Sequence, residues 1–434
     1  MNWLRRYLNG RLLKAVSQGD VLAIHRWAVL GAEINGRAGV FGTTPLVEAL
    51  DNNREANERE VEKIVRTLLD LGADANTPNA HGRTPLRIAV ACWRQGSILG
   101  LLLENGAIDE ESDGDIALHS AVEQRVPLEL LRRLVCVCTN LNAPFPDGYE
   151  LKYAGATVLH VATARLDTEL VSLLLENGAN VNSRDRYDAT PLHEGCHSHA
   201  DEQLEFDMAE MKSRQARILR ILADAGANLN AQTEDGETPL HIAAHDGNQE
   251  AIEFLLTDGA AVDVTDGFGC SAAQEAARVG NTECAKMLTE AGAAMSLPLA
   301  IALGDREKVR QYLAKGADTE AALETGETPL EIALRNGQLQ LALFLLDSGA
   351  KATGRALAAA SQHGQTEAVA RLLKDGAPAD GGDETPISPL EWADMGENPE
   401  VAALLREAGA TRKPDREQTV ERTNVAEATE GSGG

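Results

Sequence analysis

Hydrophobic and polar positions alternate along the chain as pairs of short amphipathic segments. In one example Leu240, Ala243 and Ala244 share a helical face, and a second apolar run, residues 251–256, follows after Gly247. Apolar residues spaced by three and four positions are typical of a helix with one buried face. Because glycine ends helices readily, the pattern predicts two short antiparallel helices separated at Gly247.

A Gly-Ala pair closes the second segment of most pairs. Gly226, Gly259 and Gly292 follow one another at intervals of 33 residues. We expect each of these glycines to adopt the left-handed conformation that ends a helix. The spacing indicates about twelve tandem units, one of them degenerate near Asn142. The Gly-Ala pairs begin at Gly31, Gly72, Gly106, Gly178, Gly226, Gly259, Gly292, Gly316, Gly349, Gly376 and Gly409.

A second signature marks the start of the first helix in each pair, as in Thr238-Pro239-Leu240-His241. Thr accepts a backbone N–H bond as the cap, and Pro at the first helical position loses no hydrogen bond. The signature therefore predicts a helix that begins at Pro. Further copies stand at Thr44-Pro45-Leu46, Thr84-Pro85-Leu86, Thr190-Pro191-Leu192-His193 and Thr328-Pro329-Leu330, with weaker ones at Ala117-Leu118-His119, Val158-Leu159-His160 and Ser388-Pro389-Leu390.

Together the two signatures resemble the ankyrin repeat, over residues 11–411. The resemblance implies an all-α solenoid, an ankyrin array of helix pairs with short β-hairpin fingers between consecutive units. It also implies that the concave face, made of fingers and first helices, binds partners. The four motif histidines are then expected to be hydrogen-bonded interior groups. They are His119, His160, His193 and His241.

The repeat pattern divides the chain into expected segments. Two units have only 24 and 27 residues between markers, which is too short for a full finger, so the finger row is expected to break after Gly269. The expected segments are an N-terminal capping unit (1–36), repeats with fingers and the main groove (37–293, with insertions at 51–60 and 198–212), short and regular repeats with an interrupted finger row (294–377), a C-terminal capping repeat (378–411) and a disordered tail (412–434).

Composition narrows the class of protein. The 434 residues carry a formal charge of −27, which argues against a nucleic-acid partner, and no stretch is apolar enough for a membrane span. The N-terminal residues lack the apolar segment of a secretory signal, so we expect a cytoplasmic protein. Because repeats fill nearly the whole chain, we expect no catalytic domain and no cofactor, and we expect a monomer.

One motif points to a different chemistry. Residues 193–197, His193-Glu194-Gly195-Cys196-His197, match the pattern in which two histidines on one helical face hold zinc and Glu acts as the general base. The repeat motif already accounts for His193, however, and the segment contains glycine. A zinc-dependent hydrolase that uses His193, Glu194 and His197 is therefore the lesser alternative, and we assign no metal site.

Aromatic residues are scarce, at 3% of the chain, yet six of them fall in expected fingers. Rings supply much of the binding energy in protein interfaces, so these six are candidate anchors. The opposing interpretation is that rings pack between neighbouring fingers and stiffen them. The six are Phe41, Phe145, Tyr149, Tyr153, Tyr187 and Phe268, and the long finger at residues 144–153 is the first choice for a contact site.

Charged residues at groove positions complete the candidate site. Their mixed signs favour a polar partner surface over an apolar peptide slot, although simple solvation accounts for most lone charges. They are Arg186, Glu234, Asp235, Glu237, His245, Asp246, Arg278 and Arg335. The function predicted from the sequence is a non-catalytic scaffold or adaptor that binds another protein through the concave groove. A purely structural spacer is the second alternative.

Overall fold

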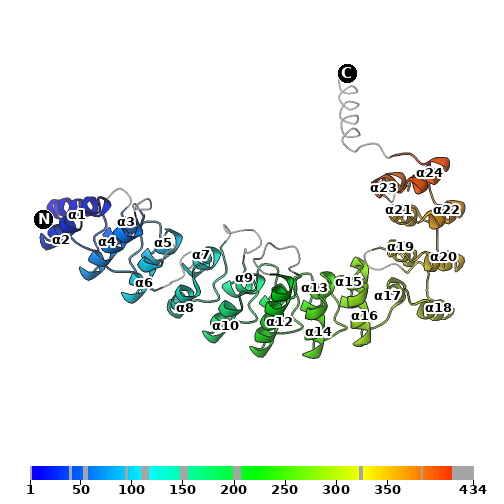
Figure 1. Cartoon of the computed structure of the whole chain (residues 1–434), viewed down its shortest axis with the longest axis horizontal. Helices are drawn as coiled ribbons and strands as arrows, with labels where there is room; N and C mark the ends of the chain where they lie inside the picture. The colour runs from blue at the N-terminus through cyan, green and yellow to red at the C-terminus, as the bar shows by residue number, and fades with distance from the viewer. Residues whose placement is uncertain are drawn as a thin grey trace, which may run out of the picture. The chain divides into compact units, whose positions relative to one another are not determined.

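Twenty-four helices, arranged as twelve consecutive pairs, make up the part of the chain that the computed structural model describes (Figure 1). That part comprises residues 2–38, 42–51, 57–92, 96–108, 117–146, 155–198, 207–321, 326–382 and 385–412. The chain divides into two units. The first is Met1–Pro239 with Thr257–Ala260, and the second is Leu240–Leu256 with Ala261–Gly434.

The first unit contains helices α1 to α12. They are α1 (Asn2–Ser17), α2 (Val21–Val29), α3 (Pro45–Asp51), α4 (Glu58–Asp70), α5 (Pro85–Cys92), α6 (Ser97–Glu104), α7 (Ala117–Glu123), α8 (Leu128–Val137), α9 (Val158–Ala164), α10 (Thr168–Glu176), α11 (Pro191–Cys196) and α12 (Met208–Asp224).

The second unit contains nearly all of α13 and α14 and the whole of the following helices. They are α13 (Pro239–His245), α14 (Gln249–Thr257), α15 (Ala272–Val279), α16 (Thr282–Glu290), α17 (Leu297–Ala302), α18 (Arg306–Ala314), α19 (Pro329–Arg335), α20 (Leu339–Asp347), α21 (Gly354–Gln362), α22 (Thr366–Lys374), α23 (Pro389–Met395) and α24 (Pro399–Glu407).

The helix boundaries follow the two sequence signatures. Six first helices begin at the proline of the Thr/Ser-Pro-Leu signature, and Thr328 caps α19 by accepting the N–H of Glu331. All eleven marker glycines have positive φ, from 77° at Gly106 to 107° at Gly292, as the sequence predicts. Since L-residues with a side chain rarely adopt this conformation, these eleven second helices end at glycine, whereas α8 ends before Cys138 in an extended conformation.

Hairpin fingers connect successive pairs where the chain is long enough. Antiparallel bridges join Ala38 to Thr43 and Thr265 to Ser271. By contrast, α16 and α17 are joined by residues 291–296 alone, and α20 and α21 by residues 348–353. Six residues leave no room for a hairpin between helices, so the finger row is interrupted at these two connections.

In three repeats an asparagine four residues after the marker glycine, namely Asn35, Asn76 or Asn182, links the repeat to the next one. Asn182 Nδ2 donates to the carbonyl of Gly226 at 3.0 Å, and its Oδ1 accepts the N–H of Asn228 at 2.7 Å. Asn76 makes the same two bonds to Gly106 and Ile108, at 2.9 and 2.8 Å. One side chain thus occupies a backbone donor and a backbone acceptor of the neighbouring unit, which fixes their spacing.

The motif histidines form a second set of links. Their Nε2 atoms lie 3.0–3.1 Å from a carbonyl oxygen at the base of the next finger, and all four side chains are buried. These histidines are therefore satisfied interior groups, which confirms the prediction from the repeat motif. The pairs are His119 with Ala143, His160 with Ala189, His193 with Glu237, and His241 with Cys270.

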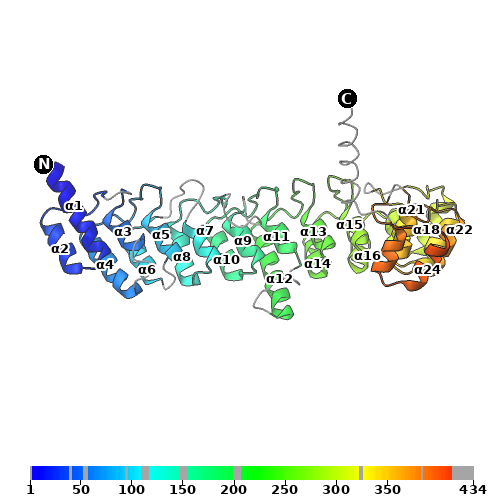
Figure 2. The same cartoon turned by 90° about the horizontal axis from the view of Figure 1, so that it is seen from above.

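The second expected insertion changes the length of one helix. Helix α12 has 17 residues, whereas α10 in the preceding pair has nine. Figure 2 shows α12 extending past α8 and α10 on the side away from the loops. Gln215 anchors the added turns, because its Nε2 donates to the carbonyls of Gly195 and His197 at 2.9 and 2.6 Å.

Two further expected segments lie partly outside the described residues. Asp51 ends α3 and Glu58 begins α4, so helices enter the first expected insertion from both sides. Residues 413–434 of the expected tail lie outside the described residues. None of the helices within the described ranges is both long and apolar enough to cross a membrane.

Candidate functional site

Two finger tips are built on the same turn. Asp185 Oδ1 accepts the N–H groups of Tyr187 and Ala189, both at 2.8 Å, and the Asp185 N–H donates to the Ala189 carbonyl. Asp266 repeats this arrangement with the N–H groups of Phe268 and Cys270, at 2.9 and 2.8 Å. A carboxylate that accepts two N–H bonds fixes the turn, so the ring two residues later is held at the tip.

Both tip rings are exposed to solvent. Tyr187 is 58% exposed in the first unit, and Phe268 is 60% exposed in the second. An exposed ring on a turn that is already ordered loses little conformational entropy when it is buried by a partner. These two rings therefore have the geometry expected of interface anchors.

Phe145 behaves differently, and the expectation that it lies exposed on a finger is wrong. Its side chain is only 2% exposed and stacks on the ring of His119, with the ring centroids 4.2 Å apart. Its backbone N–H donates to the carbonyl of Ala156, which places the residue at the base of the finger. Phe145 therefore stiffens the array. The other three candidate rings, Phe41, Tyr149 and Tyr153, lie outside the described residues.

The charged finger residues of the first unit lie beside Tyr187. Arg186, Glu234 and Asp235 are exposed, and the Glu234 N–H donates to the carbonyl of Tyr187 at 2.8 Å. A backbone bond between two fingers holds their tips together. In this unit, the structure thus brings one ring and three charges of mixed sign onto neighbouring fingers.

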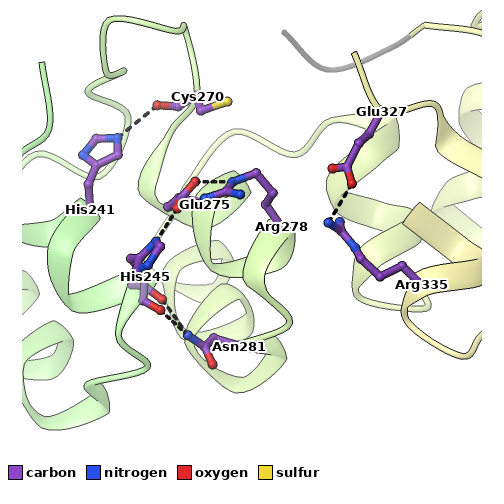
Figure 3. A network of polar contacts seen from close by, with 9 residues as sticks. His241, His245, Cys270, Glu275, Arg278, Asn281, Glu327 and Arg335 are labelled. Carbon is purple, nitrogen blue, oxygen red and sulfur yellow. Dashed lines mark hydrogen bonds and ion pairs between the residues drawn. The ribbon is translucent and has the colours of Figure 1, made fainter. Parts of the chain in front are cut away.

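In the second unit, the first helices of two consecutive pairs meet through one carboxylate. Glu275 on α15 is only 6% exposed, yet His245 Nδ1 on α13 lies 2.6 Å from its Oε1 (Figure 3). Arg278 approaches from the other side, with Nη2 at 2.5 Å from Oε1 and Nε at 2.8 Å from Oε2. The candidate residues His245 and Arg278 are thus joined by Glu275.

Electrostatics keep this carboxylate ionised. Burial alone would raise the pKa of Glu275, but the hydrogen bonds from Arg278 and His245 lower it below its ordinary value. The pKa of Arg278 is raised, first by its hydrogen bond to Glu275 and further by the charge of Glu327. Glu275 therefore remains negative and fixes the side chains of Arg278 and His245.

The polar surface continues along the first helices of the second unit. Arg335 on α19 forms an ion pair with Glu327 at 2.7 Å, and Arg355 on α21 lies 3.4 Å from Glu331. Asp246, the remaining candidate, is half-buried just after α13. Sequence analysis missed Glu275 and Glu327. The spacing of three residues between Glu275 and Arg278 is typical of an ion pair on one helix and could have indicated it. The contact of Glu275 with His245 joins two consecutive repeats, and no local spacing indicates it.

The zinc pattern at residues 193–197 lacks the geometry of a metal site. His193 Nδ1 accepts the N–H of Thr190 at 3.0 Å and Nε2 lies 3.1 Å from the Glu237 carbonyl, so both ring nitrogens are engaged. Helix α11 ends at Cys196, and His197 has an extended backbone. Across the described ranges, no group of three or more His, Cys, Asp and Glu side chains is placed to hold a metal ion.

Comparison with known proteins gives independent information on this architecture. Residues 118–206 and 207–298 match the family model described as "Ankyrin repeats (3 copies)". The chain is 30% identical to the human Neurogenic locus notch homolog protein 1 over 164 residues, 32% to human Rabankyrin-5 over 144, and 32% to human B-cell lymphoma 3 protein over 154.

These similarities cover only part of each protein. They involve 37%, 31% and 34% of this chain, and 6%, 11% and 32% of the respective relatives. The matched model residues include the motif histidines His119, His160, His193 and His241. The family model, the relatives and the paired helices with their glycine and histidine positions agree that this chain contains ankyrin repeats.

Proposed function

We propose that this chain is a non-catalytic scaffold or adaptor that binds another protein through its finger tips and first helices. Ankyrin-repeat proteins generally mediate protein–protein interaction and are generally not catalysts. The observation that carries the proposal is the exposure of Tyr187 and Phe268 on turns fixed by Asp185 and Asp266.

Each unit has its own candidate surface. In the first unit it comprises Tyr187 with the neighbouring charges Arg186, Glu234 and Asp235. Aromatic anchors surrounded by polar residues are the composition expected of a protein interface.

In the second unit the surface comprises Phe268 and the contacts of His245 and Arg278 with Glu275. The half-exposed His245 side chain can contact a partner directly while Glu275 fixes its orientation. We further propose a cytoplasmic, monomeric protein whose partner presents polar groups to these surfaces.

The test is quantitative affinity capture from native lysate with wild-type protein and the variants Tyr187→Ala and Phe268→Ala. Tyr7→Ala is the matched control for the first unit, because Tyr7 is 53% exposed on α1 and lies outside the fingers. Met395→Ala serves in the second, where Met395 is 66% exposed. Truncating an anchor is expected to lower partner recovery at least tenfold, whereas the controls retain it.

Circular dichroism checks that every variant keeps its helices. Retention of all partners by the doubly substituted protein would instead favour the structural spacer. A hydrolase would have to bind zinc in equilibrium dialysis and lose that metal in a His193→Gln variant.

A further inference from the structure

A cleft of about 340 Å³ lies in the first unit, away from the finger residues described above. It is formed by the turns from α7 to α8 and from α9 to α10, together with α12. Most of the side chains around it are apolar. They include Val126, Leu131 and Leu170, and the polar ones are Arg125, Arg165, Asp167 and Arg214.

Two departures from the repeat pattern place side chains in this cleft. The first helix of a pair is followed by a left-handed glycine at positions such as Gly247 and Gly337, with φ of 72° and 69°. The corresponding residues here are Arg125 and Leu166, with φ of 55° and 56°. An L-residue in this conformation is strained, yet both side chains line the cleft.

A third departure opens the space between the two turns. At two such places in the second unit, the residue after the left-handed position donates to the end of the first helix of the preceding pair. Asn281 Nδ2 bonds the Ala244 carbonyl at 3.0 Å, and Gln338 Nε2 bonds that of Ala302 at 2.7 Å. The corresponding residue after Leu166 is Asp167, whose carboxylate accepts the N–H of Leu170 at 3.0 Å instead.

Arginines occupy the edge of the opened space. Arg165 Nη1 donates to the carbonyl of Val122 at 2.5 Å, and Arg214 reaches the cleft from the added turns of α12. Arg214 also bonds Glu210 on its own helix, at 3.0 and 2.9 Å. A guanidinium has five N–H donors in a planar fork, so the arginines make the lining of the cleft rich in hydrogen-bond donors.

The charge around the cleft is opposite in sign to that of the whole chain. Three arginines and one aspartate line it, and Glu210 pairs with one of the three, Arg214, so the positive charges still outnumber the negative ones, whereas the chain carries a formal charge of −27. The aspartate, Asp167, already accepts the Leu170 N–H. An anion entering the cleft therefore meets a net positive edge above an apolar floor.

We propose that this cleft binds an apolar carboxylate, meaning a hydrocarbon body with a single carboxyl group. The floor formed by Val126, Leu131 and Leu170 buries the hydrocarbon, and the planar guanidinium groups at the edge match the carboxylate. The volume falls at the lower end of about 300–1,000 Å³ that is usual for small-molecule sites. This site is independent of the protein-binding surfaces proposed above.

The first test compares ligands on the full-length wild-type protein by isothermal titration calorimetry at low salt and pH 7.5. Octanoate is expected to bind saturably with one site per chain, whereas octanamide and octylammonium are expected to bind at least tenfold more weakly. A short acetylated peptide ending in leucine with a free carboxyl group is the second carboxylate probe. Tighter binding of octanoate would indicate that the natural ligand is a free acid. Tighter binding of the peptide would indicate the C-terminus of a polypeptide chain.

The second test locates the site. Arg165→Met and Arg214→Met are each expected to weaken octanoate binding about tenfold, because each removes a charge-assisted hydrogen bond. Leu128→Trp keeps the arginines and narrows the cleft, so it should weaken binding as well. Arg66→Met is the matched control, since Arg66 is an exposed helical arginine paired with Glu62 and lies outside the lining.

Hydrogen exchange supplies a readout that does not depend on substitution. Bound octanoate is expected to slow exchange in residues 122–131 and 162–170 and to leave the second unit unchanged. The proposal is overturned if octanoate shows no saturable binding to folded wild-type protein. It is also overturned if octanamide binds equally well, or if Arg165→Met, Arg214→Met and Leu128→Trp all bind as the wild type does.

Discussion

His193 Nε2 lies 3.1 Å from the carbonyl oxygen of Glu237, a residue at the base of the next finger. Its Nδ1 accepts the N–H of Thr190, so the neutral ring with hydrogen on Nε2 satisfies both contacts. The pKa of His193 is lowered from 6.5 to about 4, mainly by burial, and the charges of His197 and His160 add to this effect. The link between these two consecutive repeats therefore depends on an uncharged imidazole.

Acid should weaken this link. The unfolded chain binds a proton at His193 near pH 6.5, whereas the folded protein binds it only near pH 4. The stabilisation is thus complete above pH 6.5 and is lost as the pH falls from 6.5 to 4, by on the order of 3 kcal/mol. Urea unfolding at pH 7.0 and 4.5 should show a smaller drop for His193→Gln than for wild type. Equal drops in the two proteins would contradict this assignment.

The asparagine links predict opposite effects at two corresponding positions. Asn182→Asp removes the donor to the Gly226 carbonyl and keeps the acceptor, so we expect a loss of about 1–2 kcal/mol in the free energy of unfolding. Asp263 at the corresponding position only accepts, from the N–H of Ala294 at 2.7 Å. Asp263→Asn should therefore add a bond to the neighbouring glycine carbonyl and stabilise the protein by about 0.5–1 kcal/mol. Thermal unfolding of the Asn182→Asp and Asp263→Asn variants beside the wild type measures both changes in stability. A destabilised Asp263→Asn protein would contradict the prediction.

A glycine at position 397 should stabilise the C-terminal pair. Glu397 is exposed and has φ of 54°, whereas Gly337 and Gly364 occupy the corresponding positions in the two preceding pairs. Glu397→Gly removes the strain of a left-handed L-residue, with an expected gain of about 0.5–1 kcal/mol after the added entropy of the unfolded glycine. Gly337→Ala is the inverse control. A Cβ there would meet no atom within 4 Å, so any loss of stability reports the backbone conformation alone.

Helix α18 is expected to be the weakest element of the second unit. It buries only Val309, whereas α20 buries Leu341, Ala342, Leu345 and Leu346. With so little apolar contact, its amide hydrogens should exchange at least tenfold faster than those of α20. Hydrogen exchange with mass spectrometry measures both in one experiment. Protection of α18 equal to that of α20 would refute the prediction.

The helix boundaries could be predicted because the residues that set them are local. Proline at the first helical position and glycine with positive φ act through their own backbone, so Pro239 and Gly259 reveal a helix start and end without knowledge of neighbours. The histidine links could be expected only through the family resemblance. Their carbonyl partners lie 24–44 residues away in sequence.

The candidate site was harder to predict because burial depends on position within a finger. Tyr187 and Phe268 each follow a turn-forming aspartate by two residues, and this spacing marks an exposed tip. Phe145 has its backbone paired with Ala156 at the finger base, so its ring faces His119. In all three cases the sequence indicated an aromatic residue in a finger. Whether its ring is exposed at the tip or buried at the base depends on where the residue lies relative to the turn.

The bonds made by Asn76 and Asn182 have an evolutionary consequence. Each joins a unit only to the one that follows it, and the partner atoms belong to the backbone, which every unit possesses. A gene segment encoding one whole unit can therefore be duplicated or lost while the new neighbours meet with the same contacts. Arrays linked in this way can gain or lose repeats in evolution without changes in the contacts between neighbouring repeats.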